Sequence, residues 1–223
     1  PDESGAPPDY VYWVANAPSS NALYGDRLAV AGHSGVYLWN RLPIAGEPPD
    51  AQFTARIGSA SFSNLSGIAM DARYFSLADA SGKVWVWDGV PTSTQEPVAT
   101  LTVGQPTQLH SDGQYLTVTQ TESSQVLVYR FADLGPNAQP YITLDNTRLG
   151  GQMRLALPED ATVADGRLYV ADTVNNRVLS WTLDAARAGQ TPDVVLGADD
   201  LNDITPEIGR AKLFWPGALS YDG

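Results

Sequence analysis

The 223-residue chain has no cysteine and only two histidines. The lack of cysteine excludes disulfides, thiolate metal sites and cysteine nucleophiles, but it does not by itself choose a cellular compartment. Positive charge is also scarce, because 13 Lys and Arg residues stand against 25 Asp and Glu, which gives a net charge of −12. This balance opposes binding to nucleic acid, whose phosphate backbone requires clustered Lys and Arg.

Long apolar runs are missing as well. No stretch approaches the ~20 apolar residues that a membrane-spanning helix requires, and no charged-then-apolar signal peptide is recognisable. The sequence contains no P-loop, no dinucleotide-binding fingerprint and no GxSxG nucleophile elbow. The lack of long apolar runs predicts no membrane span. We expect an extracellular or periplasmic location.

Turn residues and short alternating strands are what the chain has in quantity, with 20 Gly and 16 Pro. The clearest unit starts at Pro158, and its first two strands are separated by the turn dipeptide Asp165-Gly166. Asp172 to Asn176 forms the next connection. The strands of this unit, which we expect to pair in antiparallel order, are 161–163, 167–171, 177–181 and 193–196.

The same four-stranded unit recurs along the chain. Earlier copies are expected at 21–57, 66–103 and 107–144, and a fifth begins with a strand at 216–221. Two kinds of anchor repeat at intervals of about 40–50 residues: an apolar residue in the second strand and an aromatic residue that ends the third. The second-strand anchors are Leu28, Phe75, Leu116 and Leu168, and the third-strand anchors are Trp39, Trp87, Tyr129 and Trp181.

This period predicts an all-β fold, namely a β-propeller of four-stranded antiparallel blades. We expect the anchors to occupy equivalent buried positions, and we expect one turn of helix at most, at 185–188. Residues 1–9 should form a loose N-terminal arm and residues 10–223 the propeller, which begins with a strand at 10–14. The chain should cover about four to five blades of a ring that has five to six when complete, so that a further C-terminal segment or another chain would close it.

The fourth unit resembles the NHL repeat, through Pro158, Asp165-Gly166, Ala171-Asp172 and Asn175-Asn176-Arg177. The linker from Asp193 to Pro216 is similar to that of bacterial NHL proteins. The strong match covers residues 157–223, whereas the three earlier units match only in outline. The resemblance implies a propeller, commonly six-bladed, and it implies no single activity, because this fold hosts many.

A polar cluster in the fourth unit, made of Asp172, Asn175, Asn176 and Arg177, could bind a ligand at the rim of the blade. The structural alternative, which we favour, is that Asp172 caps its turn and pairs with Arg177, since short polar side chains bond to nearby backbone. In either case these residues should lie at the edge of the blade where the second strand turns into the third.

Metal sites are harder to assemble from this chain. His33 in a turn and His110 on an inner strand are interpreted as turn or packing residues, and two histidines cannot form the three-His zinc site of amidating-lyase propellers. The cluster Asp199, Asp200, Asn202 and Asp203 has oxygen ligands that suit Ca²⁺ but lacks the ordered spacing and central Gly of an EF-hand loop, and we interpret it as a solvated acidic loop. We expect no cofactor and no metal site, with weak Ca²⁺ binding left open.

Two functions remain open. The one we favour is a non-catalytic propeller that binds a protein or a small ligand on the face with the second-to-third-strand turns and the long inter-blade loops, because variable loops on a repeating scaffold commonly carry recognition. Arginine offers a planar fork for carboxylates, although these side chains could equally pair with nearby acids of the chain itself. The expected contact residues are Arg148, Arg154, Arg210, His33, Asp79, Asp172, Asn176 and Arg177.

The alternative is a metal-dependent hydrolase or lyase that resembles gluconolactonase-type propellers, which hold a central Ca²⁺ with Glu, Asn and Asp. The positions expected on the inner strands are poor in carboxylates, and this weighs against such an enzyme. They are Gly67, Ala69, Gln108, His110, Thr162 and Ser220.

Overall fold

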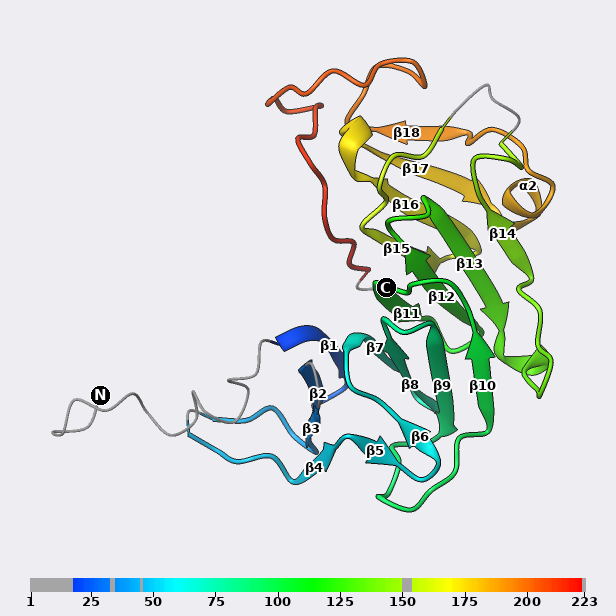
Figure 1. The fold of residues 1–223 in the computed structure, drawn as a ribbon. Helices are drawn as coiled ribbons and strands as arrows, with labels where there is room; N and C mark the ends of the chain where they lie inside the picture. Colours follow the sequence, from blue (N-terminus) through cyan, green and yellow to red (C-terminus); the bar gives the residue numbers. More distant parts are fainter. Residues whose placement is uncertain (1–17, 33–34, 45, 150–153, 222–223) are drawn as a thin grey trace, which may run out of the picture.

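The computed structural model describes residues 18–32, 35–44, 46–149 and 154–221. Four sheets of four antiparallel strands make up most of it, together with one two-stranded sheet and three short helical turns. The four-stranded sheets follow one another along an arc in chain order, as the blades of a β-propeller do (Figure 1). The predicted arm at 1–9 and the predicted strand at 10–14 lie outside the described residues.

The strands agree closely with the repeat. Those of blade one are β1 (Pro18–Tyr24), β2 (Arg27–Gly32), β3 (Gly35–Trp39) and β4 (Ala51–Thr54). Those of blade two are β7 (Leu65–Met70), β8 (Tyr74–Asp79), β9 (Lys83–Asp88) and β10 (Ala99–Thr102). The two-stranded sheet, β5 (Arg56–Ile57) with β6 (Ala60–Ser61), lies in the connection between these blades.

The second half of the chain repeats the plan. The strands of blade three are β11 (Gln108–Ser111), β12 (Tyr115–Gln120), β13 (Gln125–Arg130) and β14 (Ile142–Leu144). Those of blade four are β15 (Asp160–Ala164), β16 (Arg167–Asp172), β17 (Arg177–Thr182) and β18 (Val194–Leu196). The helical turns are η1 (Phe131–Asp133), η2 (Thr173–Asn175) and α2 (Leu183–Arg187), the last where one turn of helix was expected. Within the described ranges no helix is long and apolar enough to cross a membrane.

The repeating anchors pair across the second and third strands in every blade. Their directly opposed pairs are Leu28 with Trp39, Phe75 with Trp87, Leu116 with Tyr129, and Leu168 with Trp181. Opposed residues in an antiparallel pair share one face of the sheet, so both anchors of a blade face the same way. The prediction of equivalent positions is therefore confirmed.

The prediction that the anchors are buried is confirmed for the four aromatic residues, which are at most 6% exposed, and is wrong for Leu28 of blade one. Phe75, Leu116 and Leu168 are 0% exposed, whereas Leu28 is only half-buried. In blades two to four this face packs against the preceding blade, and each contact contains one hydrophobic core cluster. No described blade precedes blade one, so the side chain of Leu28 keeps part of its surface in water.

In three of the blades the aromatic anchor also forms a hydrogen bond to the connection between the third and fourth strands. The indole N–H of Trp39, Trp87 and Trp181 donates to a backbone carbonyl in the connection to the fourth strand, at Glu47, Gln95 and Gln190 respectively. The three N–O distances are 3.2, 3.0 and 2.9 Å. In blade three the equivalent residue is Tyr129, and its burial raises the pKa of the phenol to about 12.

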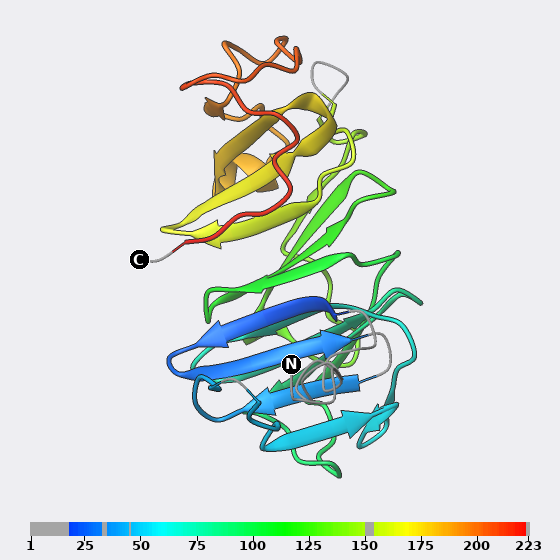
Figure 2. The same cartoon turned by 90° about the vertical axis from the view of Figure 1, so that its left-hand side faces the viewer.

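The expected strand at 216–221 is not formed, and this prediction is wrong. The segment instead runs along blade four beside β15 (Figure 2). The hydroxyl of Thr173 donates to the carbonyl of Pro216 at 2.8 Å, and the N–H of Leu219 donates to the carboxylate of Asp160 at 2.7 Å. Since these bonds go to side chains of blade four, they hold the segment without a backbone ladder.

Candidate functional site

The second-to-third-strand turns and the inter-blade loops meet on one face, which we call the loop-bearing face. At blade four it contains the turn η2, residues 154–157 and the loop 197–215. The N–H of Val174 donates to the carbonyl of Ala156 at 3.2 Å, and the side-chain amide of Asn175 donates to the carbonyl of Arg154 at 2.9 Å. The structure therefore joins these segments into one surface.

A buried ion pair bonds to the loops that form that surface. Arg177 Nε lies 2.8 Å from Asp172 Oδ2, and the two side chains are 2% and 0% exposed. Asp172 also accepts the N–H of Ala156 at 2.7 Å, while Arg177 donates to the carbonyls of Leu201 and Arg154. The pair thus holds both inter-blade loops of blade four. The expected pairing of Asp172 with Arg177 is present, whereas the Asp172 side chain makes no capping hydrogen bond to the turn η2, so that part of the interpretation is wrong.

Asn176 fixes the loop 197–215 at two points. It has left-handed backbone geometry, with φ of 56°, which asparagine tolerates well in a turn. Its side-chain amide donates to the carbonyl of Ile204 at 3.1 Å, and its side-chain oxygen accepts the N–H of Trp215 at 3.2 Å. The residue is buried and therefore positions the loop; it does not contact solvent-borne molecules directly.

Asp79 in blade two occupies the place that Asp172 has in blade four, at the end of the second strand. It accepts the N–H groups of Ser63 and Asn64 from the preceding loop and of Ser81 from its own turn. Burial acts to raise the pKa of this carboxyl, but the hydrogen bonds from Ser81, Asn64 and Ser63 outweigh it and hold the pKa below its usual value. His33, predicted for the same face, lies outside the described residues.

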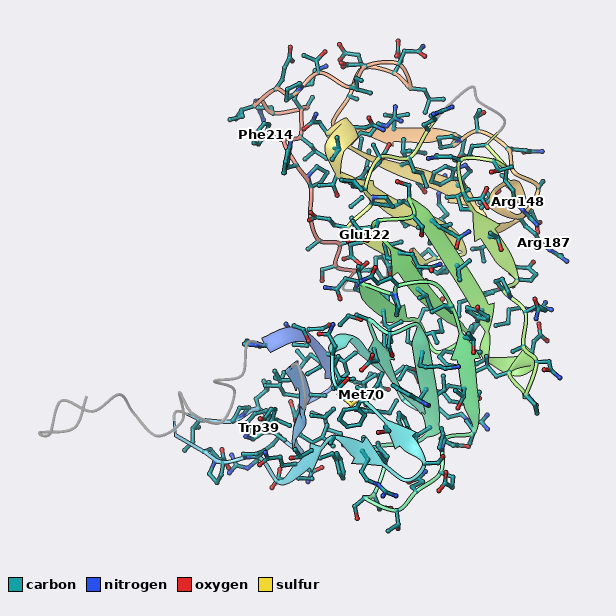
Figure 3. The ribbon with its side chains drawn as sticks, viewed as in Figure 1. Trp39, Met70, Glu122, Arg148, Arg187 and Phe214 are labelled. Atoms are coloured by element: carbon teal, nitrogen blue, oxygen red, sulfur yellow. The ribbon has the colours of Figure 1, made fainter. Side chains whose placement is uncertain are left out.

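The three predicted contact arginines are exposed but do not come together. Arg154 lines a cavity of about 540 Å³ in the loop-bearing face. Arg210 lies in the turn between Gly209 and Lys212 within the loop 197–215. Arg148 lies on the outer edge of the molecule near Arg187 (Figure 3) and does not line the cavity.

The acidic cluster in the loop 197–215 has a cation of its own. Lys212 Nζ lies 2.9 Å from Asp199 Oδ1 and 2.7 Å from Asp203 Oδ2. The hydrogen bond from Lys212 lowers the pKa of Asp203, and the bond from Asp203 raises the pKa of Lys212. The ammonium therefore occupies two of the carboxylates that a calcium ion would use. Among the residues described, no group of three or more His, Asp or Glu could hold a metal ion.

The sequence interpretation missed a set of exposed apolar side chains on the loop-bearing face. Ile208 is 93% exposed, and the rings of Phe214 and Trp215 are 58% and 59% exposed and stack on each other with centroids 6.2 Å apart. Trp215 has a positive φ of 51°, which is uncommon for a bulky residue. Large apolar residues within a loop that also contains three Asp and two Gly were the signal available in the sequence. The set is Leu157, Val174, Ile204, Ile208, Phe214 and Trp215.

A second cavity, of about 430 Å³, lies along the inner strands of the blades. His110, which the sequence suggested was a turn or packing residue, instead lines this cavity and pairs with Asp160, with Nε2 and Oδ1 2.9 Å apart. Asp160 is buried and belongs to the neighbouring blade. The pair escaped the sequence interpretation because its two residues are 50 positions apart.

Comparisons with known proteins support the fold. No protein-family model and no curated protein matches the sequence. Among solved structures, the chain is similar to the computationally designed Ika8 protein (TM-score 0.53, 11% identity), to Kuenenia stuttgartiensis hydrazine synthase (0.57, 12%) and to the WD40 β-propeller domain of Doa1 (0.54, 14%). The matches cover 77%, 81% and 84% of this chain and 46%, 49% and 56% of those chains. The chain thus spans about half the length of these structures, and the likeness shows a β-propeller fold alone.

Proposed function

We propose that this chain is a non-catalytic propeller module of the NHL type that binds a protein partner through the loop-bearing face of blade four. The observation that carries the proposal is the set of exposed apolar side chains there, Leu157, Val174, Ile204, Ile208, Phe214 and Trp215. Large apolar residues that are exposed singly are common, whereas groups of them mark interaction surfaces. Here the buried side chain of Asn176 bonds to the backbone of two of them, Ile204 and Trp215.

The backbone of Trp215 supports a contact role for that side chain. A non-glycine residue in a sparsely populated conformation costs about 1–3 kcal/mol and persists only where its surroundings hold it. Trp215 has φ of 51°, and its N–H is held by the buried side chain of Asn176. This conformation leaves the stacked rings of Phe214 and Trp215 mostly exposed, and a partner that covers them would bury that apolar surface.

Charge indicates the chemistry of the partner. Arg154 and Arg210 are exposed on this face of a chain whose net charge is −12, and the described structure shows no ion pair for either. Arg154 lies at a cavity of about 540 Å³ whose walls include Leu155, Leu157 and Ile204. An apolar side chain in this cavity and a carboxylate on Arg154 would satisfy both features. We therefore expect a partner segment that combines apolar and acidic residues.

The test uses the whole chain as bait in extract of its source organism, with chemical cross-linking to capture the partner, followed by titration of the purified partner. In the variant Phe214→Ala/Trp215→Ala we expect affinity to fall at least about a hundredfold, because buried aromatic anchors dominate binding at interfaces. Tyr24→Ala is the matched control, since Tyr24 is a similarly exposed aromatic on blade one. Equal affinity of both variants for the partner would reject this face as the binding site.

A further inference from the structure

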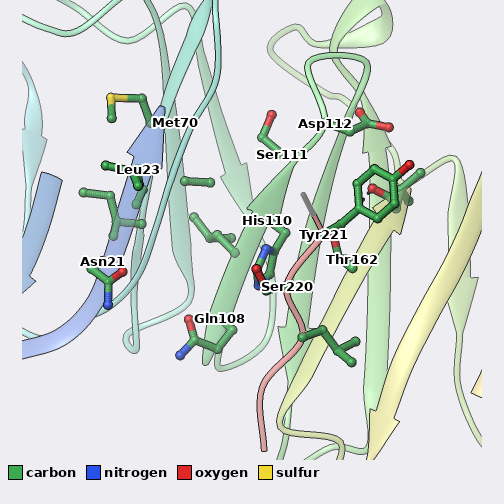
Figure 4. Close-up of a pocket in the computed structure, with 16 residues that line it drawn as sticks. Asn21, Leu23, Met70, Gln108, His110, Ser111, Asp112, Thr162, Ser220 and Tyr221 are labelled. Atoms are coloured by element: carbon green, nitrogen blue, oxygen red, sulfur yellow. Dashed lines mark hydrogen bonds between the residues drawn. The ribbon is translucent and has the colours of Figure 1, made fainter. Parts of the chain in front are cut away.

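The cavity along the inner strands is a second place where polar side chains with spare hydrogen-bonding groups lie close together. Its walls come from β1, β7, β11 and β15 and from the segment 219–221, so every blade contributes (Figure 4). Its volume of about 430 Å³ is within the range of small-molecule sites. We infer that this cavity binds a small uncharged molecule with several hydroxyl groups, independently of the partner surface on blade four.

His110 supplies a fixed hydrogen-bond acceptor. Its Nε2 lies 2.9 Å from Asp160 Oδ1, and Asp160 also accepts the N–H groups of Ala161 and Leu219. A carboxylate only accepts, so Nε2 must donate, and in the neutral ring Nδ1 then carries a lone pair. No partner of Nδ1 occurs among the residues described, and the side chain is 33% exposed. The buried carboxylate thus orients an acceptor at the cavity wall.

Gln108 supplies the complementary donor. Its Oε1 accepts the hydroxyl of Ser20 at 3.1 Å, which leaves the NH₂ group for a ligand. Gln108 and His110 are two residues apart on β11, so they share one face of the strand, about 7 Å apart along it. The hydroxyls of Thr162 and Ser220, which can donate and accept, also line the cavity.

The charged residues at the cavity wall do not suit an anionic ligand. No Lys or Arg is among the residues that line the cavity, and the carboxylate of Asp112 lies at its wall. A phosphate or carboxylate ligand would therefore meet no full positive charge and one negative one. Apolar side chains such as Leu23, Met70 and Val163 complete the wall and suit the C–H faces of a ring. Donors and acceptors without a cation favour neutral hydroxyl groups.

The experiment exploits the two histidines of the chain. Long-range ¹H–¹⁵N NMR spectra of the whole labelled protein resolve both rings, and the variant His33→Gln assigns them. We expect the Nε2-protonated form of His110 in the free protein. On titration with myo-inositol or D-glucose, the Nδ1 resonance of His110 should shift saturably as it accepts a ligand hydroxyl, while His33 should not respond. Inorganic phosphate at the same concentration should leave His110 unchanged.

Two variants separate this site from the partner surface. Gln108→Ala should weaken polyol binding about fivefold, the loss expected for one hydrogen bond, and Arg154→Ala should leave it unchanged. The inference is overturned by a His110 signal that does not saturate with either polyol, by unaltered affinity in Gln108→Ala, or by a response to phosphate in place of the polyols. Partner binding by Gln108→Ala should remain intact, so failure here leaves the proposed function of the loop-bearing face standing.

Discussion

Blades one and four end the arc, and they differ in how their faces and loops are held. In blade four the second strand ends at Asp172, which pairs with Arg177 and bonds to the loop before the blade. In blade one the second strand ends at Gly32, which has no side chain to do either. The anchor of blade four is fully buried, whereas Leu28 of blade one is only half-buried. One repeat unit can therefore give blades that differ in two ways, in how the end of the second strand is held and in how far the second-strand anchor is buried.

The buried pair is the sharpest way to test this contrast. Replacing Arg177 with Ala leaves the carboxylate of Asp172 buried without its cation, and removing one partner of such a pair costs about 3–5 kcal/mol. We expect a loss of that size in the free energy of unfolding measured with guanidinium chloride. Arg27→Ala, at an exposed arginine of blade one, is the control and should change stability by less than about 0.5 kcal/mol.

The double variant Asp172→Leu/Arg177→Met adds a second control. It removes both charges together, and replacing a buried pair with apolar groups of similar size is often close to neutral. Stability of the double variant well above that of Arg177→Ala is the expected result. If Arg177→Ala unfolds at the same denaturant concentration as the unmodified chain, the pair does not hold the loops of blade four.

Substitution of the second-strand anchors tests the same contrast between blades four and one in their hydrophobic packing. Leu168→Ala removes a side chain that is 0% exposed and should destabilise the protein by about 2–5 kcal/mol. Leu28→Ala removes the equivalent side chain from the half-buried position and should lose less, about 1 kcal/mol, because less surface leaves the protein interior. Thermal and denaturant unfolding of both variants give the comparison. Equal losses would mean that the outer face of blade one is covered in solution.

Asp79 offers the most specific effect, through pH. Its folded pKa lies below the ordinary value of 3.8, so its stabilisation is fully present above that value and is lost as the pH falls through the folded pKa. Asp79→Asn should cost about 1–3 kcal/mol at pH 7 and should flatten the decline in stability below about pH 4. Unfolding curves from pH 2.5 to 7 check both parts. A variant that declines as steeply as the unmodified chain would show that other carboxyls cause the acid sensitivity.

The blades were predictable because their signals are local. The anchor period and the turn dipeptides place the strands within a few residues of where they form, and the alternation within each strand fixes which side chains face the neighbouring blade. The pairing of Asp172 with Arg177 followed from the same local reasoning, since the two residues flank one turn. Short-range chemistry of this kind can be read without knowing how the blades are placed.

The sites were not predictable, because they depend on contacts between distant segments. His110 and Asp160 are 50 residues apart, and Leu219 and Asp160 are 59 apart. The predicted strand at 216–221 failed for the related reason that its neighbours bond to it through side chains, a donor on Thr173 and an acceptor on Asp160, in place of a backbone ladder. Arg148, Arg154 and Arg210 were grouped because they share a loop class, yet of the three only Arg154 lines the cavity in the loop-bearing face.

The hydrogen-bonded indoles of three blades can each serve as a fluorescence probe for the blade that contains them. Trp39, Trp87 and Trp181 each place the indole N–H on a carbonyl within the same blade, while blade three has a tyrosine at that position. Emission from a tryptophan moves to longer wavelength when its ring meets water, so single-tryptophan variants, in which the other five of the six tryptophans are replaced, would show the order in which the blades open. The repeat that builds the core thus also supplies a spectroscopic record of how it comes apart.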